Sequence, residues 1–172
     1  HLMADLFEAH DKRHFETWAY SIGPQTGDAM QQRLKKAFDH FIDARLMSDE
    51  AVATHMARAG IDIVVGLKGY TRDSRPDILA WRPAPLQLSY LGYPGTLGAP
   101  YVDAVLVDAV LAQPGDEAHF SEPVVRLPGS YQVNNALHPV GAPAPTRAET
   151  GLPEGAFVFS CFNSAWKSTP PL

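Results

Sequence analysis

The hydrophobic residues of this chain fall into short runs whose spacing alternates between helical and extended patterns. Apolar positions recur at helical spacing over residues 2–9, whereas residues 15–22 alternate in the manner of a strand. The same criteria predict helices at residues 29–37, 49–59 and 76–81, a helical turn at 115–120, and strands at 40–43, 61–67, 86–91, 102–107 and 124–127. Strands that alternate with helices are typical of βαβ units, so the pattern predicts an α/β fold with a parallel sheet.

Polar residues mark where two of these helices begin. Asp28 precedes the helix at 29–37, and Ser48 precedes the helix at 49–59, so each side chain is expected to cap a helix N-terminus. Gly60 follows the second helix and is expected to end it as the C′ residue. The next segment, 61–67, is almost continuously apolar and β-branched, which predicts a strand that is covered on both faces.

The stretch from Arg82 to Gly98 combines a proline-set turn, a short apolar strand and a glycine-rich bend. Glycines at positions 92, 95 and 98 allow backbone conformations that a Cβ atom would forbid. A strand that leads into such a bend presents a backbone-lined surface at the carboxyl end of a sheet, where α/β proteins bind ligands. Pro94 and Pro100 exclude a helix that opens at these glycines, so they are not the dinucleotide-binding fingerprint.

The composition changes after residue 132, where prolines and glycines accumulate up to Pro153. We therefore predict a partial Rossmann-like domain at 1–133, a linker at 134–153, and the first strand and loop of a second Rossmann-like domain at 154–172. The strand of that second domain is expected at residues 157–162. A single strand is not stable without neighbours, so its fold depends on pairing.

Composition narrows the possible partners. The 172 residues carry a net charge of −5, which argues against nucleic acid or an anionic membrane as the main partner. No apolar run approaches the roughly 20 residues of a membrane helix. The single cysteine, Cys161, leaves no internal disulfide and fits a reducing compartment, so a cytoplasmic location is expected. No metal site is expected, because His10 and His14 lack a third ligand nearby.

Several segments resemble one family. Arg-Pro-Ala-Pro at 82–85, Gln87, Leu91 and Tyr-Pro-Gly-Thr at 93–96 are similar to the catalytic region of the protein O-GlcNAc transferase and SPINDLY family. The resemblance runs over nearly the whole chain. It implies the N-terminal half of a GT-B glycosyltransferase, an architecture of two Rossmann-like domains, here truncated at both ends.

The resemblance also implies a role for two loops. Gly69-Tyr70-Thr71 matches a family segment beside the active cleft, and the turn at 93–96 is expected to form a wall whose backbone N–H groups bind sugar hydroxyls or phosphate. The structural alternatives are a turn with a solvent-facing tyrosine and a device that reverses the chain. The residues expected to bind substrate or donor are Gly69, Tyr70, Thr71, Tyr93, Pro94, Gly95, Thr96 and Asn163.

Lys167 is the expected catalytic residue. The segment Cys161 to Lys167 resembles the family's Phe-Asn-x-x-Tyr-Lys, whose lysine contacts the diphosphate of the sugar nucleotide. A fixed ammonium stabilises the negative charge that develops on the β-phosphate as the glycosyl bond breaks. In most chains a lysine after a strand is instead a solvated charge.

The implied reaction is the inverting transfer of N-acetylglucosamine from UDP-GlcNAc to Ser or Thr hydroxyls of an acceptor protein, without a metal or other cofactor. The family's candidate catalytic histidine is expected before His1, the nucleobase pocket belongs to the second domain, and the tetratricopeptide repeats that usually recruit the acceptor in this family are not present in these residues. The isolated chain is therefore expected to be inactive. GDP-fucose or UDP-glucose is the alternative donor. Ala59, Gly66 and Trp166 depart from the family pattern and favour a non-catalytic interaction module. An unrelated α/β binding domain is the third alternative.

Three acidic residues receive structural roles. Asp103 and Asp108 flank an apolar strand and are expected to cap or to pair rather than to catalyse. Glu122 lies in a Ser-Glu pair that resembles a family motif, and only a turn-capping role is expected for this pair.

Overall fold

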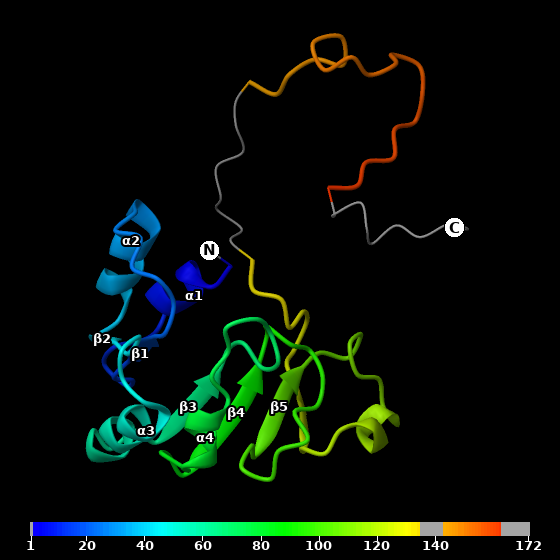
Figure 1. Cartoon of the computed structure of the whole chain (residues 1–172). Helices are drawn as coiled ribbons and strands as arrows, with labels where there is room; N and C mark the ends of the chain where they lie inside the picture. Colours follow the sequence, from blue (N-terminus) through cyan, green and yellow to red (C-terminus); the bar gives the residue numbers. More distant parts are fainter. Residues whose placement is uncertain (1, 135–142, 163–172) are drawn as a thin grey trace. The chain divides into compact units, whose positions relative to one another are not determined.

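The computed structural model describes residues 2–134 and 143–162 of the chain. The chain divides into two compact units, His1–Asn135 and Ala136–Leu172, each of which is considered by itself. Every helix and strand among the described residues lies in the first unit (Figure 1). The boundary between the units falls within the proline- and glycine-rich segment, and the predicted division into two domains and a linker stays a prediction.

Two parallel strands form a small sheet near the start of the first unit. β1 (Trp18–Ser21) pairs with β2 (His40–Asp43), and α2 (Ala29–Ala37) connects them. Asp39 fixes the start of this pair, because its carboxylate accepts hydrogen bonds from the backbone N–H and the hydroxyl of Thr17 at 2.8 and 2.7 Å. α1 (Ala4–Glu8) packs against α2.

A four-stranded parallel sheet forms the larger part of the unit. Its strands are β3 (Ile63–Gly66), β4 (Leu86–Tyr90), β5 (Ala104–Val107) and β6 (Val124–Arg126), which pair in the order of the sequence. α3 (Asp49–Arg58) leads into β3, α4 (Asp77–Ala80) connects β3 to β4, and the 3-10 helix η1 (Asp116–His119) connects β5 to β6. The predicted α/β fold with parallel sheets and flanking helices is confirmed.

The helix boundaries follow the predicted caps. The side chain of Asp28 accepts a hydrogen bond from the backbone N–H of Gln31, and that of Ser48 accepts one from Ala51. Each bond satisfies one of the N–H groups that have no partner at a helix N-terminus. Gly60 has φ of +70°, the left-handed conformation expected of a C′ glycine.

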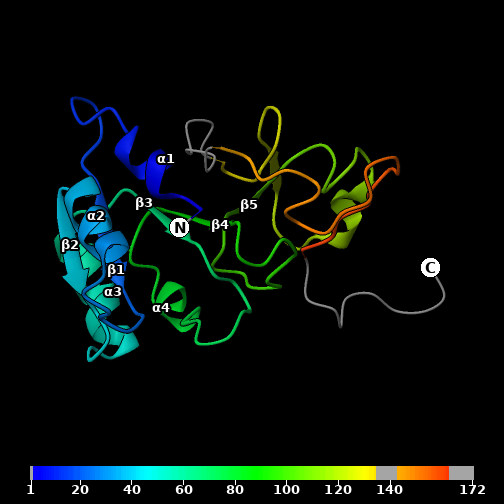
Figure 2. The same ribbon diagram turned by 90° about the horizontal axis from the view of Figure 1, so that it is seen from above.

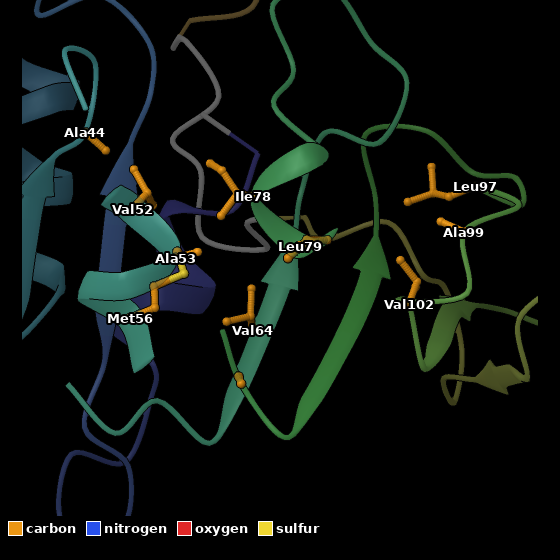
Figure 3. Close-up of a cluster of buried hydrophobic side chains, with 11 residues drawn as sticks. Ala44, Val52, Ala53, Met56, Val64, Ile78, Leu79, Leu97, Ala99 and Val102 are labelled. Atoms are coloured by element: carbon orange, nitrogen blue, oxygen red, sulfur yellow. The ribbon is translucent and has the colours of Figure 1, made fainter. Parts of the chain in front are cut away.

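The main core lies between α3, α4 and one face of the larger sheet. Figure 3 shows its buried side chains, with Val52 and Met56 of α3 facing Ile78 of α4 and Val64 of β3. Figure 2 shows α4 on one side of β3 and β4. The packing explains why a helix as short as α4 is stable: its apolar residues are buried against the sheet.

The prediction that the strand at 61–67 is covered on both faces is wrong. Val64 is buried, but its neighbours Ile63 and Val65 are 52% and 41% exposed, and Val125 on the same face is 44% exposed. The sequential strand order gives the reason. Each new strand is added at the same edge of the sheet. Because the crossover connections between parallel strands are right-handed, they then all lie on one face of the sheet and leave the other face uncovered.

The strand expected at residues 157–162 is also not observed. Within residues 143–162 of the second unit, the structure contains turns and extended chain without a pairing partner. Thr146 and Glu149 close one turn, since the Glu149 carboxylate accepts a 2.7 Å hydrogen bond from the Thr146 backbone N–H. An apolar, β-branched pattern does not by itself produce a strand where the chain offers no hydrogen-bonding neighbour.

Candidate functional site

Two loops leave the larger sheet side by side at its carboxyl edge. β3 ends at Gly66 and β4 ends at Tyr90, and the parallel register pairs Gly66 with Ser89. The loops that follow, residues 67–71 and 91–98, therefore begin next to each other. This edge is where open α/β sheets bind ligands.

Two glycines allow the loops to touch. The backbone N–H of Gly92 donates to the carbonyl oxygen of Leu67 at 3.1 Å. A Cβ atom on Gly92 would lie 2.3 Å from that oxygen, and one on Gly69 would lie 2.7 Å from Cβ of Tyr93. Gly69 also has φ of +53°, which side chains disfavour. Both positions thus require glycine for space, and Gly69 requires it for conformation as well.

Backbone strain accompanies this contact. Leu91, between the end of β4 and Gly92, adopts φ of +70° although it is not a glycine. Such a conformation costs on the order of 1–3 kcal/mol and persists only where the surroundings impose it. The bend after β4 is therefore held in a defined shape.

The tyrosines of the two loops form an aromatic pair that remains open to solvent. The rings of Tyr70 and Tyr93 meet edge to face with centroids 5.9 Å apart, and they are 56% and 38% exposed. The Tyr70 hydroxyl donates to the carbonyl oxygen of Leu97 at 2.6 Å. The pair presents ring faces and edges, surfaces that stack well on sugar or nucleobase rings.

A buried carboxylate accepts two hydrogen bonds from the second loop. Glu122 is 4% exposed and accepts a hydrogen bond from the Thr96 hydroxyl at 2.6 Å and one from the Leu97 backbone N–H at 2.9 Å. This contact could not be predicted from the sequence beyond the Ser-Glu pair itself, because Glu122 is distant from the loop in the chain and its partners are an ordinary hydroxyl and a backbone N–H.

The other two buried or half-buried acids at β5 are engaged by fixed donors. Asp103 accepts from the Arg82 guanidinium at 2.9 Å and from the Gln87 backbone N–H at 2.7 Å, and these donors lower the pKa of its carboxyl. Asp108 accepts from the backbone N–H groups of Tyr131 and Leu111, which lower its pKa in the same way. Both occupy the structural roles that the sequence predicted.

The two loops line none of the cavities described here, and the described residues contain no metal site. A cavity of about 610 Å³ runs along α3 and is lined by residues such as Trp18 and His55, not by the two loops. Across residues 2–134 and 143–162, no three His, Cys, Asp or Glu side chains gather where they could hold a metal ion. No helix in that part of the chain is long and apolar enough to cross a membrane.

Comparison with known proteins identifies the family. Residues 1–140 match Glycosyl transferase family 41. The chain belongs to this family. The match includes both loops and Glu122.

The relatives of this family 41 chain are much longer than it. It is 37% identical over 180 residues to a protein of Arabidopsis thaliana named probable UDP-N-acetylglucosamine–peptide N-acetylglucosaminyltransferase SEC, covering 100% of this chain and 18% of the relative. It is 31% identical to the UDP-N-acetylglucosamine–peptide N-acetylglucosaminyltransferase of Caenorhabditis elegans, over 78% of this chain and 12% of that protein.

A solved structure shares the fold. A mutant of the Thermobaculum terrenum O-GlcNAc transferase superimposes with a TM-score of 0.73 at 32% identity, over 76% of this chain and 25% of that one. The chain thus spans about a quarter or less of the proteins it matches. The resemblance to a GT-B transferase expected from the sequence is confirmed.

The predicted site residues of this family 41 chain separate into two groups. The structure brings seven of them together at the carboxyl edge of the sheet, namely Gly69, Tyr70, Thr71, Tyr93, Pro94, Gly95 and Thr96. Asn163 and Lys167 lie outside the described residues. The binding role of Asn163 and of the seven loop residues, and the catalytic role of Lys167, stay predictions.

Proposed function

We propose that this chain forms one wall of the active cleft of a protein O-glycosyltransferase. The complete enzyme transfers N-acetylglucosamine from UDP-GlcNAc to Ser or Thr side chains of acceptor proteins, with inversion at the anomeric carbon. It acts in the cytoplasm, in keeping with a chain whose single cysteine forms no internal disulfide.

The observation that carries this proposal is the meeting of the two loops at the carboxyl edge of a parallel sheet. Glycines at 69 and 92 bring the backbones into contact, and Tyr70 and Tyr93 remain exposed beside them. A rigid, open wall of this kind suits a nucleotide sugar or an extended peptide better than a closed pocket does. The names of the matched relatives, which describe transfer of N-acetylglucosamine to peptides, support the choice of reaction.

In the proposed reaction the acceptor hydroxyl oxygen attacks the anomeric carbon while the bond from that carbon to the diphosphate breaks. The electron pair of that bond goes to the nucleoside diphosphate, and the proton of the hydroxyl goes to a base that we expect before His1 in the complete protein. Lys167 stabilises the charge on the leaving diphosphate as a compact cation. The two loops hold the reacting groups in place and need supply no titrating side chain.

The complete transferase that contains this sequence provides the test. Purified enzyme is incubated with a Ser/Thr acceptor peptide and, in parallel, with UDP-GlcNAc, GDP-fucose or UDP-glucose, and the anomeric configuration of the product is read by NMR. We expect transfer from UDP-GlcNAc and a β-linked product. Lys167→Ala should lower kcat by about 10²–10³-fold, the usual effect of removing one charge-stabilising group, while Lys36→Ala on the exposed side of α2 should not.

The outcomes separate the alternatives. Transfer from GDP-fucose or UDP-glucose alone would show that the protein is a glycosyltransferase with a donor other than UDP-GlcNAc. A complete protein that transfers no sugar, yet retains acceptor binding in the Lys167→Ala variant, would favour the interaction module. The 172-residue chain alone is expected to show no turnover. Measured turnover by this chain would contradict the proposal that it forms only one wall of the active cleft.

A further inference from the structure

Glu122 bonds directly to the second loop of the candidate site, 91–98, and reaches the first loop, 67–71, only through Leu97. It lies between η1 and β6, and its side chain is almost fully buried. One carboxylate oxygen accepts from the Thr96 hydroxyl and the other from the Leu97 backbone N–H, at 2.6 and 2.9 Å. Both oxygens therefore hold the same turn.

The Thr96 hydroxyl is fully used in this arrangement. It donates to Glu122 and accepts from the backbone N–H groups of Ser121 and Gly98, each at 3.1 Å. A hydroxyl has one proton and two lone pairs, so no hydrogen-bonding capacity remains. Its geometry is fixed from three sides.

Leu97 carries the connection to the first loop. Its backbone N–H donates to Glu122, and its carbonyl oxygen accepts from the Tyr70 hydroxyl at 2.6 Å. Its side chain is 5% exposed and belongs to the main core, where Figure 3 shows it near Ala99. A single residue thus joins the buried carboxylate, the glycine-rich turn and the exposed tyrosine.

The geometry points to Glu122 as a positioning residue of the transferase: through Thr96 and Leu97 it sets the turn at 93–96 and the Tyr70 ring in the arrangement that binds the nucleotide sugar. This inference rests on the proposed function. Glu122 itself touches no substrate in this account and takes part in no proton transfer.

Glutamine cannot replace this carboxylate. The bonds at 122 require two acceptor oxygens, because both partners donate. A glutamine at 122 offers one acceptor oxygen and an NH₂ group. Its NH₂ would have to face either the Leu97 N–H or a Thr96 hydroxyl whose lone pairs are already taken. Glu122→Gln preserves size and shape but breaks one bond of the connection.

The first measurement uses the 172-residue chain. Amide hydrogen exchange at Leu97 should become faster in Glu122→Gln, whereas exchange at Asp103 should not, because the Asp103 N–H bonds to Gln87 at the opposite edge of the sheet. Equal acceleration at both amides would indicate general destabilisation and overturn the inference. Unchanged exchange at Leu97 would overturn it as well.

The second measurement uses the complete transferase at a temperature well below its unfolding midpoint. Glu122→Gln should raise KM for the nucleotide sugar about tenfold, because small displacements of positioning groups have large effects on binding and rate. Partial unfolding would lower the active fraction and the apparent kcat but leave KM unchanged. Thr96→Val should also raise KM, and Thr96→Ser, which keeps the hydroxyl, should restore it.

Asp103→Asn is the matched control. Asp103 also accepts from a backbone N–H, but at the amino end of β5, away from the loops. Its loss should lower stability without changing KM, and an equal rise of KM in this variant would overturn the role assigned to Glu122. If the wild-type enzyme transfers no sugar, the proposed function fails, and the Leu97 exchange still decides whether Glu122 fixes the loops.

Discussion

At the scale of single residues, Gly92 is required by the close approach of the two loops. Its backbone N–H donates a 3.1 Å hydrogen bond to the carbonyl oxygen of Leu67, and there is no space for a Cβ atom beside that oxygen. A bend at this position is predicted from the sequence through the conformational freedom of glycine, whereas the contact with Leu67 is not. Contacts between segments distant in the chain, such as that of Glu122 with Thr96, leave no periodic pattern to read.

Gly92→Ala should destabilise the first unit. The added methyl group would meet a carbonyl oxygen and Cα of Lys68, which are backbone atoms that cannot rotate away. We expect a loss of about 1–3 kcal/mol in the free energy of unfolding, the range of overpacking substitutions. Denaturant unfolding of this chain measures it. Gly23→Ala is the control, since nothing lies within 4 Å of its Cβ position, and equal losses in both variants would contradict the explanation.

Asp39 should make the small sheet sensitive to acid. Hydrogen bonds from the backbone and the hydroxyl of Thr17, together with Lys12, hold the pKa of Asp39 at about 2. Because this pKa is lower than the ordinary value of 3.8, the contribution of Asp39 to stability is complete above about pH 5 and is lost as the pH falls toward about 2.

Urea unfolding between pH 7 and pH 2 tests this contribution. Wild type should be more stable than Asp39→Asn at neutral pH, and the difference should shrink as the Asp39 carboxyl becomes protonated. A difference between the two proteins that stays constant over the whole range would show that the charge of Asp39 plays no part.

At the scale of elements, the sequence pattern predicted where most helices and strands lie, but not which of their faces are buried or which segments they pair with. Asp28 and Ser48 marked helix starts correctly, because a cap is a local hydrogen bond. The expected coverage of β3 was wrong, since coverage depends on strand order and not on the strand's own residues. The strand expected at 157–162 failed for a related reason, because pairing needs a second segment.

Substitutions of two adjacent valines in β3 test whether only one face of the larger sheet is buried. Val64 is buried against α3 and α4, whereas Val65 is 41% exposed on the other face. Val64→Ala should cost about 2 kcal/mol through lost burial and a residual cavity, and Val65→Ala should cost well under half of that. Similar losses at both positions, measured by denaturant unfolding, would mean that the second face is covered in solution.

At the scale of the whole molecule, the first unit holds its own core and all the described helices and strands. A chain that ends at Asn135 is therefore expected to fold with the same unfolding midpoint as the 172-residue chain. Circular dichroism melting of both proteins measures this. A clearly lower midpoint for the shorter chain would show that residues after 135 stabilise the first unit.

The order of strands in the larger sheet also bears on how the protein is made. In this sheet each strand after β3 pairs with the strand synthesised immediately before it, at a separation of roughly 20 residues. The loops that must close are therefore short, and the pairings are local for a parallel sheet. β3 can act as a template as soon as β4 leaves the ribosome, and β5 and β6 then extend the edge in turn. The carboxyl edge that carries the two loops can thus be assembled progressively during translation. Glu122, which is synthesised just before β6, can bond to the turn at Thr96 and Leu97 that was made earlier.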